Sequence, residues 1–453
     1  MLSEKNINQI NISNQKKRNW LGIGFCLGSV SMLSAVAGAW LALSLSATPL
    51  QQSKLTPEEA AVFNQKETAS SGINLKVPEL NRPVNILVIG TSVLTSDLEK
   101  PPSKNLGYHA QVDSFDGLSD TLLLLRFDPE SQKLNVVSIP RDTKTYVEGV
   151  GETKINSANY YGGPALTAKT VSNLLAGVPI DRFVRVNVQG VEKLIDALGG
   201  VTVYIPKDMK YTDHSQHLYI DLKKGIQHLN GDQVVQFLRF RHDELGDIGR
   251  VQRQQVLMRA LVEQVLQPKT VLRAKDILSV VQSNVDTNLS MDELVAVAGS
   301  ASQMKRSQVQ MLMLPGDFNG DGREHISYWL PDQNAIQHMM AQYFDVGYAE
   351  DEYADPASVR VAIQDGTGDY QAVQGMIGYL REAGYTRVFV GEKCQEPLDV
   401  TKIIAQKGDD GSAAAIRATL GVGEVLVEST GYLTSDITIQ LGPDWQEKYT
   451  NSQ

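Results

Sequence analysis

Cysteine is scarce in this chain of 453 residues, which contains only two. Two cysteines cannot form the disulfide framework that stabilises many small secreted domains. Cys26 lies in an apolar N-terminal run, which leaves Cys394 as the single cysteine of the remaining sequence. His214 and His217 have the spacing of some metal ligands, but no further His or Cys pair completes a zinc set.

A surplus of positive charge is also missing, because the formal net charge is -10 at pH 7. Bulk affinity for nucleic acid depends on neutralising phosphates with Lys and Arg, so this balance argues against nucleic acid as a partner. Hydrophobic residues make up 42% of the chain, which excludes a chain that is disordered throughout. The length suggests two or three domains.

Residues 20–45 contain no charged side chain. A run of this length is enough for a transmembrane helix, which needs about 20 apolar residues. A signal peptide cleaved near residues 46–48 is the alternative, although its apolar core usually has only about 7–15 residues. A basic cluster, Lys16 to Arg18, precedes the run, so residues 1–19 are expected to be cytoplasmic. We therefore expect a single-pass protein of the cell (inner) membrane with its other domains extracytoplasmic, on the periplasmic side.

After the apolar run, residues 46–83 are polar with little periodicity, and this pattern predicts a linker. Strand and helix patterns then alternate, which favours an α/β layered domain over residues 84–342. A long polar insertion over residues 92–115 is expected to form a functional or lid-like loop. Strands are expected over residues 84–89, 121–127, 134–139, 183–188 and 201–205, and helices over 164–175, 191–198 and much of 251–303.

An acidic linker over residues 343–357 leads into a smaller α/β domain over residues 358–445. Strand, helix and strand patterns over residues 359–363, 372–383 and 386–390 predict a βαβ unit. A weaker copy of this unit follows, and a last strand is expected over residues 437–441.

Lysine is absent from the most highly charged stretch, which begins at Arg239 and has four arginines within fifteen positions. Guanidinium groups bind phosphate oxygens in a bidentate manner that an ammonium group cannot match. Asp247, Arg250 and Gln254 stand at i, i+3 and i+7, so they would share one helix face. An extended backbone at Arg239 and Arg241 would place those two side chains on one face as well. The stretch therefore indicates a cradle for one or two phosphates; a surface helix with ordinary ion pairs is the alternative.

The same stretch resembles the signature of the LytR-CpsA-Psr proteins, which are membrane-anchored enzymes that attach phosphate-linked glycopolymers to bacterial cell walls. Between residues 85 and 261, five more blocks match in the family's order: Ser138-Ile-Pro-Arg141-Asp142, Lys154-Ile-Asn156-Ser-Ala, Tyr161-Gly-Gly-Pro164, Asp196-Ala-Leu-Gly-Gly-Val201 and His228-Leu-Asn230-Gly231. The long spacer before Ser119-Asp120-Thr121 is similar to cyanobacterial forms. The second domain resembles the C-terminal domain appended to many LytR-type proteins.

The resemblance implies a layered α/β/α domain and a set of site residues. Four arginines match positions that bind the pyrophosphate of the donor: Arg141, Arg239, Arg241 and Arg250. Asp120 matches a magnesium-binding aspartate. Asp247 would either orient Arg250 or accept the proton of the acceptor. The catalytic candidates are Arg141, Asp247, Arg250 and Gln254.

Two positions depart from the family pattern. Ser92 stands where the first strand is usually followed by an aspartate, and Leu118 stands where an arginine usually precedes Ser-Asp-Thr. One metal carboxylate and one phosphate-binding arginine are therefore missing. Three carboxylates of the insertion are candidates to replace the metal ligand: Asp97, Asp113 and Asp116.

The resemblance implies a phosphotransferase that moves a glycopolymer from a polyprenyl pyrophosphate carrier to peptidoglycan, beside the membrane and with Mg²⁺ as cofactor. No ATP is supplied outside the membrane, so the donor must carry its own activation, as a pyrophosphate does. A single protein carboxylate can hold Mg²⁺ when a pyrophosphate supplies other oxygens. Two alternatives are a non-catalytic protein that binds polyprenyl phosphate or a wall polymer, and an envelope-linked transcriptional attenuator. The expected topology argues against the attenuator, because the folded domains would lie across the membrane from DNA.

Overall fold

The computed structural model of the chain describes residues 50, 52–70, 77–94, 111–112, 114–214, 218–240, 246–319, 328–347, 355–394, 396–432 and 434–452. The expected cytoplasmic tail and transmembrane helix, residues 1–45, lie outside these ranges. Within the ranges that are described, no helix combines the length and the apolar character needed to cross a membrane.

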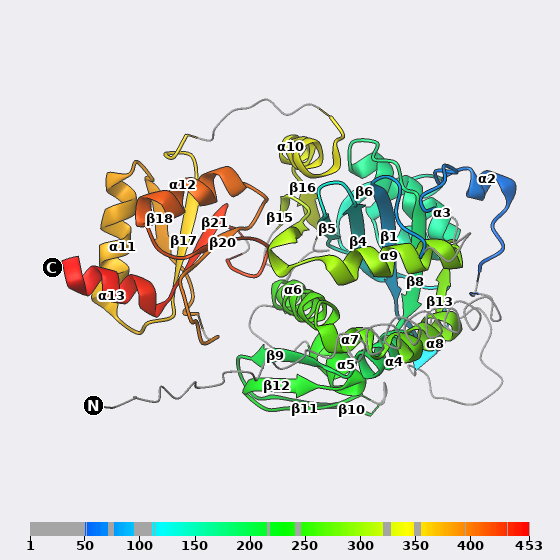
Figure 1. Cartoon of the computed structure of the whole chain (residues 1–453), viewed down its shortest axis with the longest axis horizontal. Coiled ribbons are helices and arrows are strands. Elements are labelled where there is room, and N and C mark those ends of the chain that lie inside the picture. The colour runs from blue at the N-terminus through cyan, green and yellow to red at the C-terminus, as the bar shows by residue number, and fades with distance from the viewer. Residues whose placement is uncertain are drawn as a thin grey trace, which may run out of the picture. The chain divides into compact units, whose positions relative to one another are not determined.

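A six-stranded mixed sheet forms the centre of the first domain, in the order β13-β8-β1-β4-β5-β14 (Figure 1). The strands are β1 Val84–Thr91, β4 Ser119–Asp128, β5 Lys133–Ile139, β8 Arg182–Asn187, β13 Val285–Thr287 and β14 Val309–Met313. β4 pairs antiparallel with β1 and β5, while β8 runs parallel to β1 and β14 parallel to β5. The central strands are buried on both faces, which explains their nearly continuous runs of Val, Ile and Leu.

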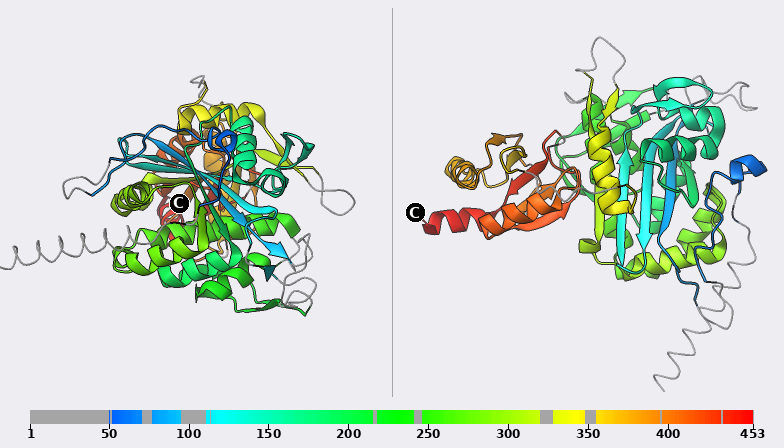
Figure 2. Two further views of the ribbon diagram at one scale, coloured as in Figure 1. Left: turned by 90° about the vertical axis from the view of Figure 1, so that its right-hand side faces the viewer. Right: turned by 90° about the horizontal axis from the view of Figure 1, so that it is seen from above.

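Helices cover both faces of this sheet and give the domain three layers (Figures 1 and 2). On one face, α3 (Ser157–Leu174) and α10 (Gln333–Phe344) bury Ala168 and Met340 in a core with Leu87 of β1. On the other face, α6 (Gly246–Val265) and α9 (Met291–Gln303) pack around Ile86 and Leu123. The expected α/β class is confirmed, and the sheet supplies the rigid frame from which the site is built.

A smaller layer packs against the side of α6 that faces away from the central sheet. It consists of α4 (Val188–Leu198), α5 (Gly231–Arg239) and two antiparallel ribbons, β9–β12 (Val201–Ile205 and Gly225–Leu229) and β10–β11 (Met209–Asp213 and Leu218–Leu222). Leu257 and Ala260 of α6 join the core of this layer, whereas Met258 and Val262 pack towards the central sheet. Because α6 is buried from two sides, its position is fixed by two cores at once.

Short elements connect these layers. They are α2 Pro57–Ala60, β2 Val93–Leu94, β3 Gln111–Val112, β6 Lys144–Val147, β7 Gly151–Lys154, α7 Pro268–Val271, α8 Ala274–Asn284, a 3₁₀ turn at Arg306–Gln308, β15 Gly316–Phe318 and β16 Trp329–Pro331. β2 and β3 pair at the two ends of the expected insertion, whose residues 95–110 lie outside the described ranges.

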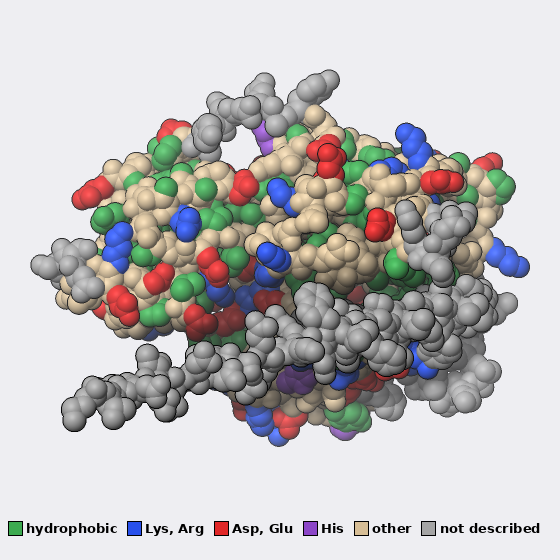
Figure 3. Space-filling model, viewed as in Figure 1, with side chains coloured by type: hydrophobic (Ala, Val, Ile, Leu, Met, Phe, Trp, Pro, Cys, Tyr) green, Lys and Arg blue, Asp and Glu red, His purple; other side chains and the backbone are tan. Residues whose placement is uncertain are grey.

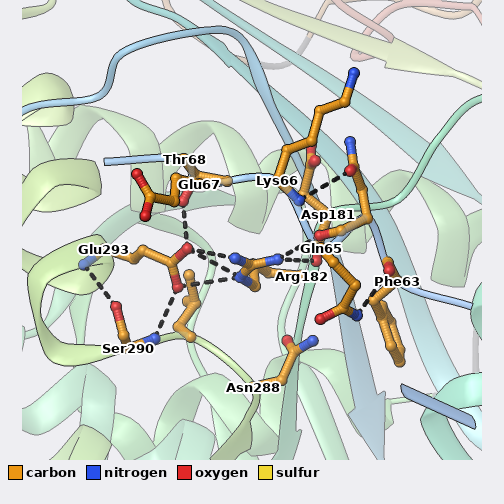
Figure 4. Close-up of polar contacts among 12 residues, drawn as sticks. Phe63, Gln65, Lys66, Glu67, Thr68, Asp181, Arg182, Asn288, Ser290 and Glu293 are labelled. Carbon is orange, nitrogen blue, oxygen red and sulfur yellow. Dashed lines mark hydrogen bonds and ion pairs between the residues drawn. The ribbon is translucent and has the colours of Figure 1, made fainter. Parts of the chain in front are cut away.

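The segment expected as a linker over residues 46–83 makes buried contacts with the first domain at residues 63–68 (Figure 4). We call residues 52–70 the strap. Phe63 of the strap is 2% exposed and belongs to the main core. Thr68 donates a hydrogen bond to Glu293, whose carboxylate also accepts two hydrogen bonds of 3.0 Å from Arg182 Nε. Buried polar contacts hold the strap, which explains why its sequence lacks a hydrophobic pattern.

The second domain has a five-stranded sheet in the order β18-β17-β21-β19-β20. Its elements are β17 Arg360–Asp365, α11 Tyr370–Glu382, β18 Arg387–Val390, β19 Lys402–Ala405, α12 Asp410–Leu420, β20 Glu424–Val427, β21 Ile437–Leu441 and α13 Pro443–Ser452. β17 and β18 pair in parallel around α11, and β19 and β20 do so around α12, so both predicted βαβ units are confirmed. The sheet and helices enclose a separate hydrophobic core. On the face of the molecule drawn in Figure 3, acidic and basic side chains are interspersed over the described surface.

Candidate functional site

Strand pairing brings three polar residues together where the central strands β1 and β5 end and β4 begins. β1 runs antiparallel to β4, so Ser92, just past the end of β1, lies beside Asp120 at the start of β4. β4 also pairs antiparallel with β5 in a register that places Leu122 opposite Ile139. Arg141, two residues past β5, therefore reaches Asp120, which lies two residues before Leu122.

Both carboxylate oxygens of Asp120 have partners in the chain. Arg141 Nη1 lies 2.5 Å from Oδ1, and the Ser92 hydroxyl donates a hydrogen bond to Oδ2. Gln254 Nε2 donates to the backbone carbonyl of Asp120 at 3.2 Å. The predicted metal residue is thus held in an ion pair with Arg141, and the hydrogen bond from Gln254 joins α6 to β4.

Asp142 is a site residue that the sequence reasoning missed. Its carboxylate lies 2.7 Å from Lys154 Nζ, 3.4 Å from Arg250 Nη2 and 3.5 Å from Arg141 Nε. The side chains of Asp142 and Arg250 are only 10% and 8% exposed. Three cations therefore share one buried carboxylate, which fixes the directions of both arginines. The signal was available, since Asp142 and Lys154 stand in two of the blocks that match the family.

Helix α6 supplies the predicted pair Arg250 and Gln254, which both line the same cavity. The helical pattern expected from residue 246 onwards is confirmed. On another face of α6, Arg253 Nη2 donates to the carbonyl of Phe240 at 2.5 Å and fixes the junction between α5 and α6. Asp247 belongs to α6, but its side chain is outside the described set, and so is all of Arg241.

Arg239 also lines the cavity, but the extended backbone considered for it is wrong. It is the last residue of α5, and Phe240 is the first extended residue after that helix. A capping box of Asn230 and Gln233 starts α5 and explains the helix, because two otherwise unpaired backbone N–H groups gain partners.

The cavity has a volume of about 360 Å³ and two kinds of wall. The polar side chains include Ser92, Asp120, Asp213, Arg239, Arg250 and Gln254. The apolar side chains come from β8, α4, α5 and the β10–β11 ribbon: Val186, Val188, Val191, Tyr211, Leu218, Val235 and Leu238. A ligand that carries both phosphate and an apolar chain would satisfy the two kinds of wall together.

A magnesium ion would find few protein ligands here. Among the residues that the structure describes, no group of three or more His, Cys, Asp or Glu side chains could share a metal ion. Asp116 of the insertion is exposed and lies 3.6 Å from Arg185, while Asp97 and Asp113 are outside the described ranges. The donor set fits Mg²⁺ only when a substrate supplies most of the oxygens, since Asp120 is a single carboxylate.

Comparisons with known proteins place this geometry in context. Residues 48–345 match the model of the LytR_cpsA_psr family, and residues 358–445 match that of the LytR cell envelope-related transcriptional attenuator. The polyisoprenyl-teichoic acid–peptidoglycan teichoic acid transferase TagU of Bacillus anthracis is 31% identical over 270 residues, covering 59% of this chain and 80% of that one. TagV of Bacillus subtilis is 32% identical over 228 residues, covering 49% and 58%. The crystal structure of B. subtilis TagV gives a TM-score of 0.47 at 27% identity, over 59% of this chain and 99% of that one.

Proposed function

The chain belongs to the LytR-CpsA-Psr family, and we propose that it is a phosphotransferase that moves a glycopolymer from a polyprenyl pyrophosphate carrier to peptidoglycan. The related enzymes TagU and TagV, whose names specify polyisoprenyl-teichoic acid and peptidoglycan, support this substrate class. The observation that carries the proposal is the joint occurrence of Arg239 and Arg250 with apolar side chains around one cavity.

The donor would bind with its pyrophosphate beside Arg250, Arg239 and Arg141 and with its prenyl chain along the valine and leucine walls. A hydroxyl oxygen of the acceptor attacks the phosphorus that carries the glycan. The bond from this phosphorus to the bridging oxygen breaks, polyprenyl monophosphate leaves with the bonding electrons, and a base takes the hydroxyl proton. Catalysis would rest mainly on positioning and on guanidinium stabilisation of the charge on the transferred phosphoryl group.

Magnesium is part of the proposal as an ion shared between protein and donor. Asp120 would hold it, and the ion would neutralise negative charge on the pyrophosphate. Asp120 is held by Arg141 and Ser92 without the donor, so the ion must compete with an internal ion pair. We therefore expect binding to be weak until the donor arrives. Asp247 stays a candidate to orient Arg250 or to accept the proton.

Residues 20–45 would anchor the enzyme in the cell membrane, with the catalytic domain on the outer, periplasmic side. The uncharged sequence of this run and the basic cluster before it support this arrangement. Such an anchor would keep the cavity close to a donor that is itself dissolved in the bilayer.

The experiment that tests the proposal uses the full-length protein in lipid vesicles. It is incubated with Mg²⁺, a polyprenyl pyrophosphate-linked glycan carrying a label, and purified peptidoglycan. We expect labelled peptidoglycan and polyprenyl monophosphate in equal amounts. Arg250→Lys should reduce the rate by roughly 100-fold, because it keeps the charge but loses the bidentate geometry. Donor binding without release of monophosphate would instead identify a non-catalytic binding protein.

A further inference from the structure

Two adjacent tyrosines, Tyr160 and Tyr161, are exposed beside the site that has been described. Their side chains are 47% and 59% exposed, although aromatic rings of this size are usually buried more deeply. The two rings meet edge to face, with centroids 5.1 Å apart. Leu118, which precedes the Ser119-Asp120 pair, is also 45% exposed. We call the two tyrosines the tyrosine platform.

A kink in α3 presents the two tyrosines. Gly162 and Gly163 have non-helical backbone angles, so the first turn of α3 is set apart from the regular helix that follows at Pro164. Gly163 has a φ of +58°, which most residues adopt only at a cost. The kink thus separates the turn with the tyrosines from the part of α3 that packs into the core.

Hydrogen bonds fix this turn against the start of β4 and the segment that follows β5. The backbone N–H of Asn156 donates to the carbonyl of Arg141 at 3.2 Å, and the carbonyl of Asn156 accepts from the N–H of Ser119 at 3.1 Å. Asn159 Nδ2 donates to the carbonyl of Gly117 at 2.7 Å. The first turn of α3 is therefore bonded directly to the segments that carry Arg141 and Asp120, and it is continuous with the site.

The chemistry of the platform suits a sugar. Rings with exposed faces and a hydroxyl at one end can contact the apolar C–H face of a pyranose and also bond its hydroxyl groups. The position is where an acceptor would have to lie, since its hydroxyl must approach a phosphate held by Arg141. We propose that the tyrosine platform binds the saccharide of the acceptor strand. This assignment rests on the proposed function and deepens it by naming the acceptor subsite.

Binding of N-acetylglucosamine oligomers, the probe for the acceptor class, is measured by calorimetry on the full-length protein. Tyr160→Ser combined with Tyr161→Ser should weaken oligomer binding by about tenfold, because two ring contacts are lost. The matching double change to Phe should keep most of the affinity, since the rings remain. Tyr370→Ser is the control, as Tyr370 is 74% exposed on the second domain. The three side chains changed are exposed enough that folding, checked by thermal unfolding, should be unaffected.

Equal oligomer affinity in the wild type and the double Ser variant would overturn the platform, and so would a wild type that does not bind the oligomer. A similar loss on Tyr370→Ser would overturn it too, because binding would then not be specific to α3. The proposed function is read separately, by the release of polyprenyl monophosphate from the donor with water as acceptor. This release should be unchanged in the double Ser variant. Its absence from the wild type would refute the proposed enzymatic activity but not the proposed binding of the saccharide.

Discussion

Replacement of Asp142 by Asn tests how the arginines that we propose to bind phosphate are positioned. Asn has the same shape but no charge, so Lys154, Arg250 and Arg141 would lose the carboxylate that they share. Asp142 does not itself line the cavity, whereas Arg250, with which it pairs, does. Its effect on the donor would therefore act through the directions of the guanidinium groups.

The size of the effect follows from burial. Removing one partner of a buried ion pair typically costs about 3–5 kcal/mol. The value should be lower here, because Lys154 is 29% exposed and Arg141 also pairs with Asp120. We expect a loss of about 2 kcal/mol in the free energy of unfolding, which would lower the Tm by roughly 4–8 °C. The misplaced arginines should raise KM for the donor by roughly 10- to 100-fold.

Glu293→Gln is a matched control, since Glu293 is another buried carboxylate that pairs with an arginine, far along the chain from the site (Figure 4). It should lower the Tm by a similar amount without changing KM for the donor. Thermal unfolding and donor titration of both variants separate the two roles. The reasoning is refuted if Asp142→Asn loses stability as expected while its KM stays within about twofold of the wild-type value.

Three further changes address the metal, the strap and the topology. Calorimetry should find weak Mg²⁺ binding that tightens when a short-chain polyprenyl pyrophosphate is added. Ser92→Asp should raise the Mg²⁺ affinity without donor by about tenfold, because it restores a second carboxylate. Equal Mg²⁺ affinity in the wild type and Asp120→Asn would remove Asp120 from the metal site. Burial alone would raise the pKa of Glu293, but hydrogen bonds from Arg182, Ser290 and Thr68 lower it below its usual 4.5. The stability that this carboxylate adds is therefore present above pH 4.5 and is lost as the pH falls through the lowered pKa, so Glu293→Gln should flatten the acid side of a stability–pH curve and an unchanged curve would contradict the assignment. Alkaline phosphatase fused after Gln453 should be active in a bacterial host, whereas a fusion without activity would contradict an extracytoplasmic C-terminus.

Several strands were predicted well from the sequence, because apolar and β-branched residues that recur between turns favour an extended backbone. β9 (Val201–Ile205) and β21 (Ile437–Leu441) have the predicted bounds. β13 (Val285–Thr287) was not predicted, since three residues are too few to show any periodicity. It lies between α8 and α9 and is recognisable only from its pairing with β8.

The strap and the start of α3 were missed for a different reason. The strap is fixed by partners distant in the sequence, such as Asp286, which accepts two hydrogen bonds of 2.7 Å from Ser53. Local composition does not report contacts of this kind. The predicted helix began at Pro164, where regular α3 geometry does begin, but the preceding turn of residues 157–161 was lost because Gly162 and Gly163 interrupt the pattern.

Residue types at the site were predicted from the resemblance, whereas their connections depended on the structure. Helix α6 places Arg250 and Gln254 in the cavity wall, and strand register pairs Arg141 with Asp120, which lines the same cavity. Asp142 stands beside Arg141 in a matching block, but the sequence alone does not show which cations its carboxylate contacts. Asp142 connects the end of β5 with Lys154 of β7 and with Arg250 of α6, which lies 108 residues further along the chain.

The two departures from the family pattern balance each other in charge. Ser92 in place of an aspartate removes one negative charge, and Leu118 in place of an arginine removes one positive charge, so the net charge around Asp120 is unchanged by the pair. The remaining carboxylate is neutralised by Arg141, and the Ser92 hydroxyl donates to it where a second carboxylate would repel it. Leu118 is apolar and 45% exposed at the position where an arginine would carry a charge. We therefore expect the two substitutions together to leave the affinity for an anionic donor unchanged and to make the site depend more on the donor for metal ligands.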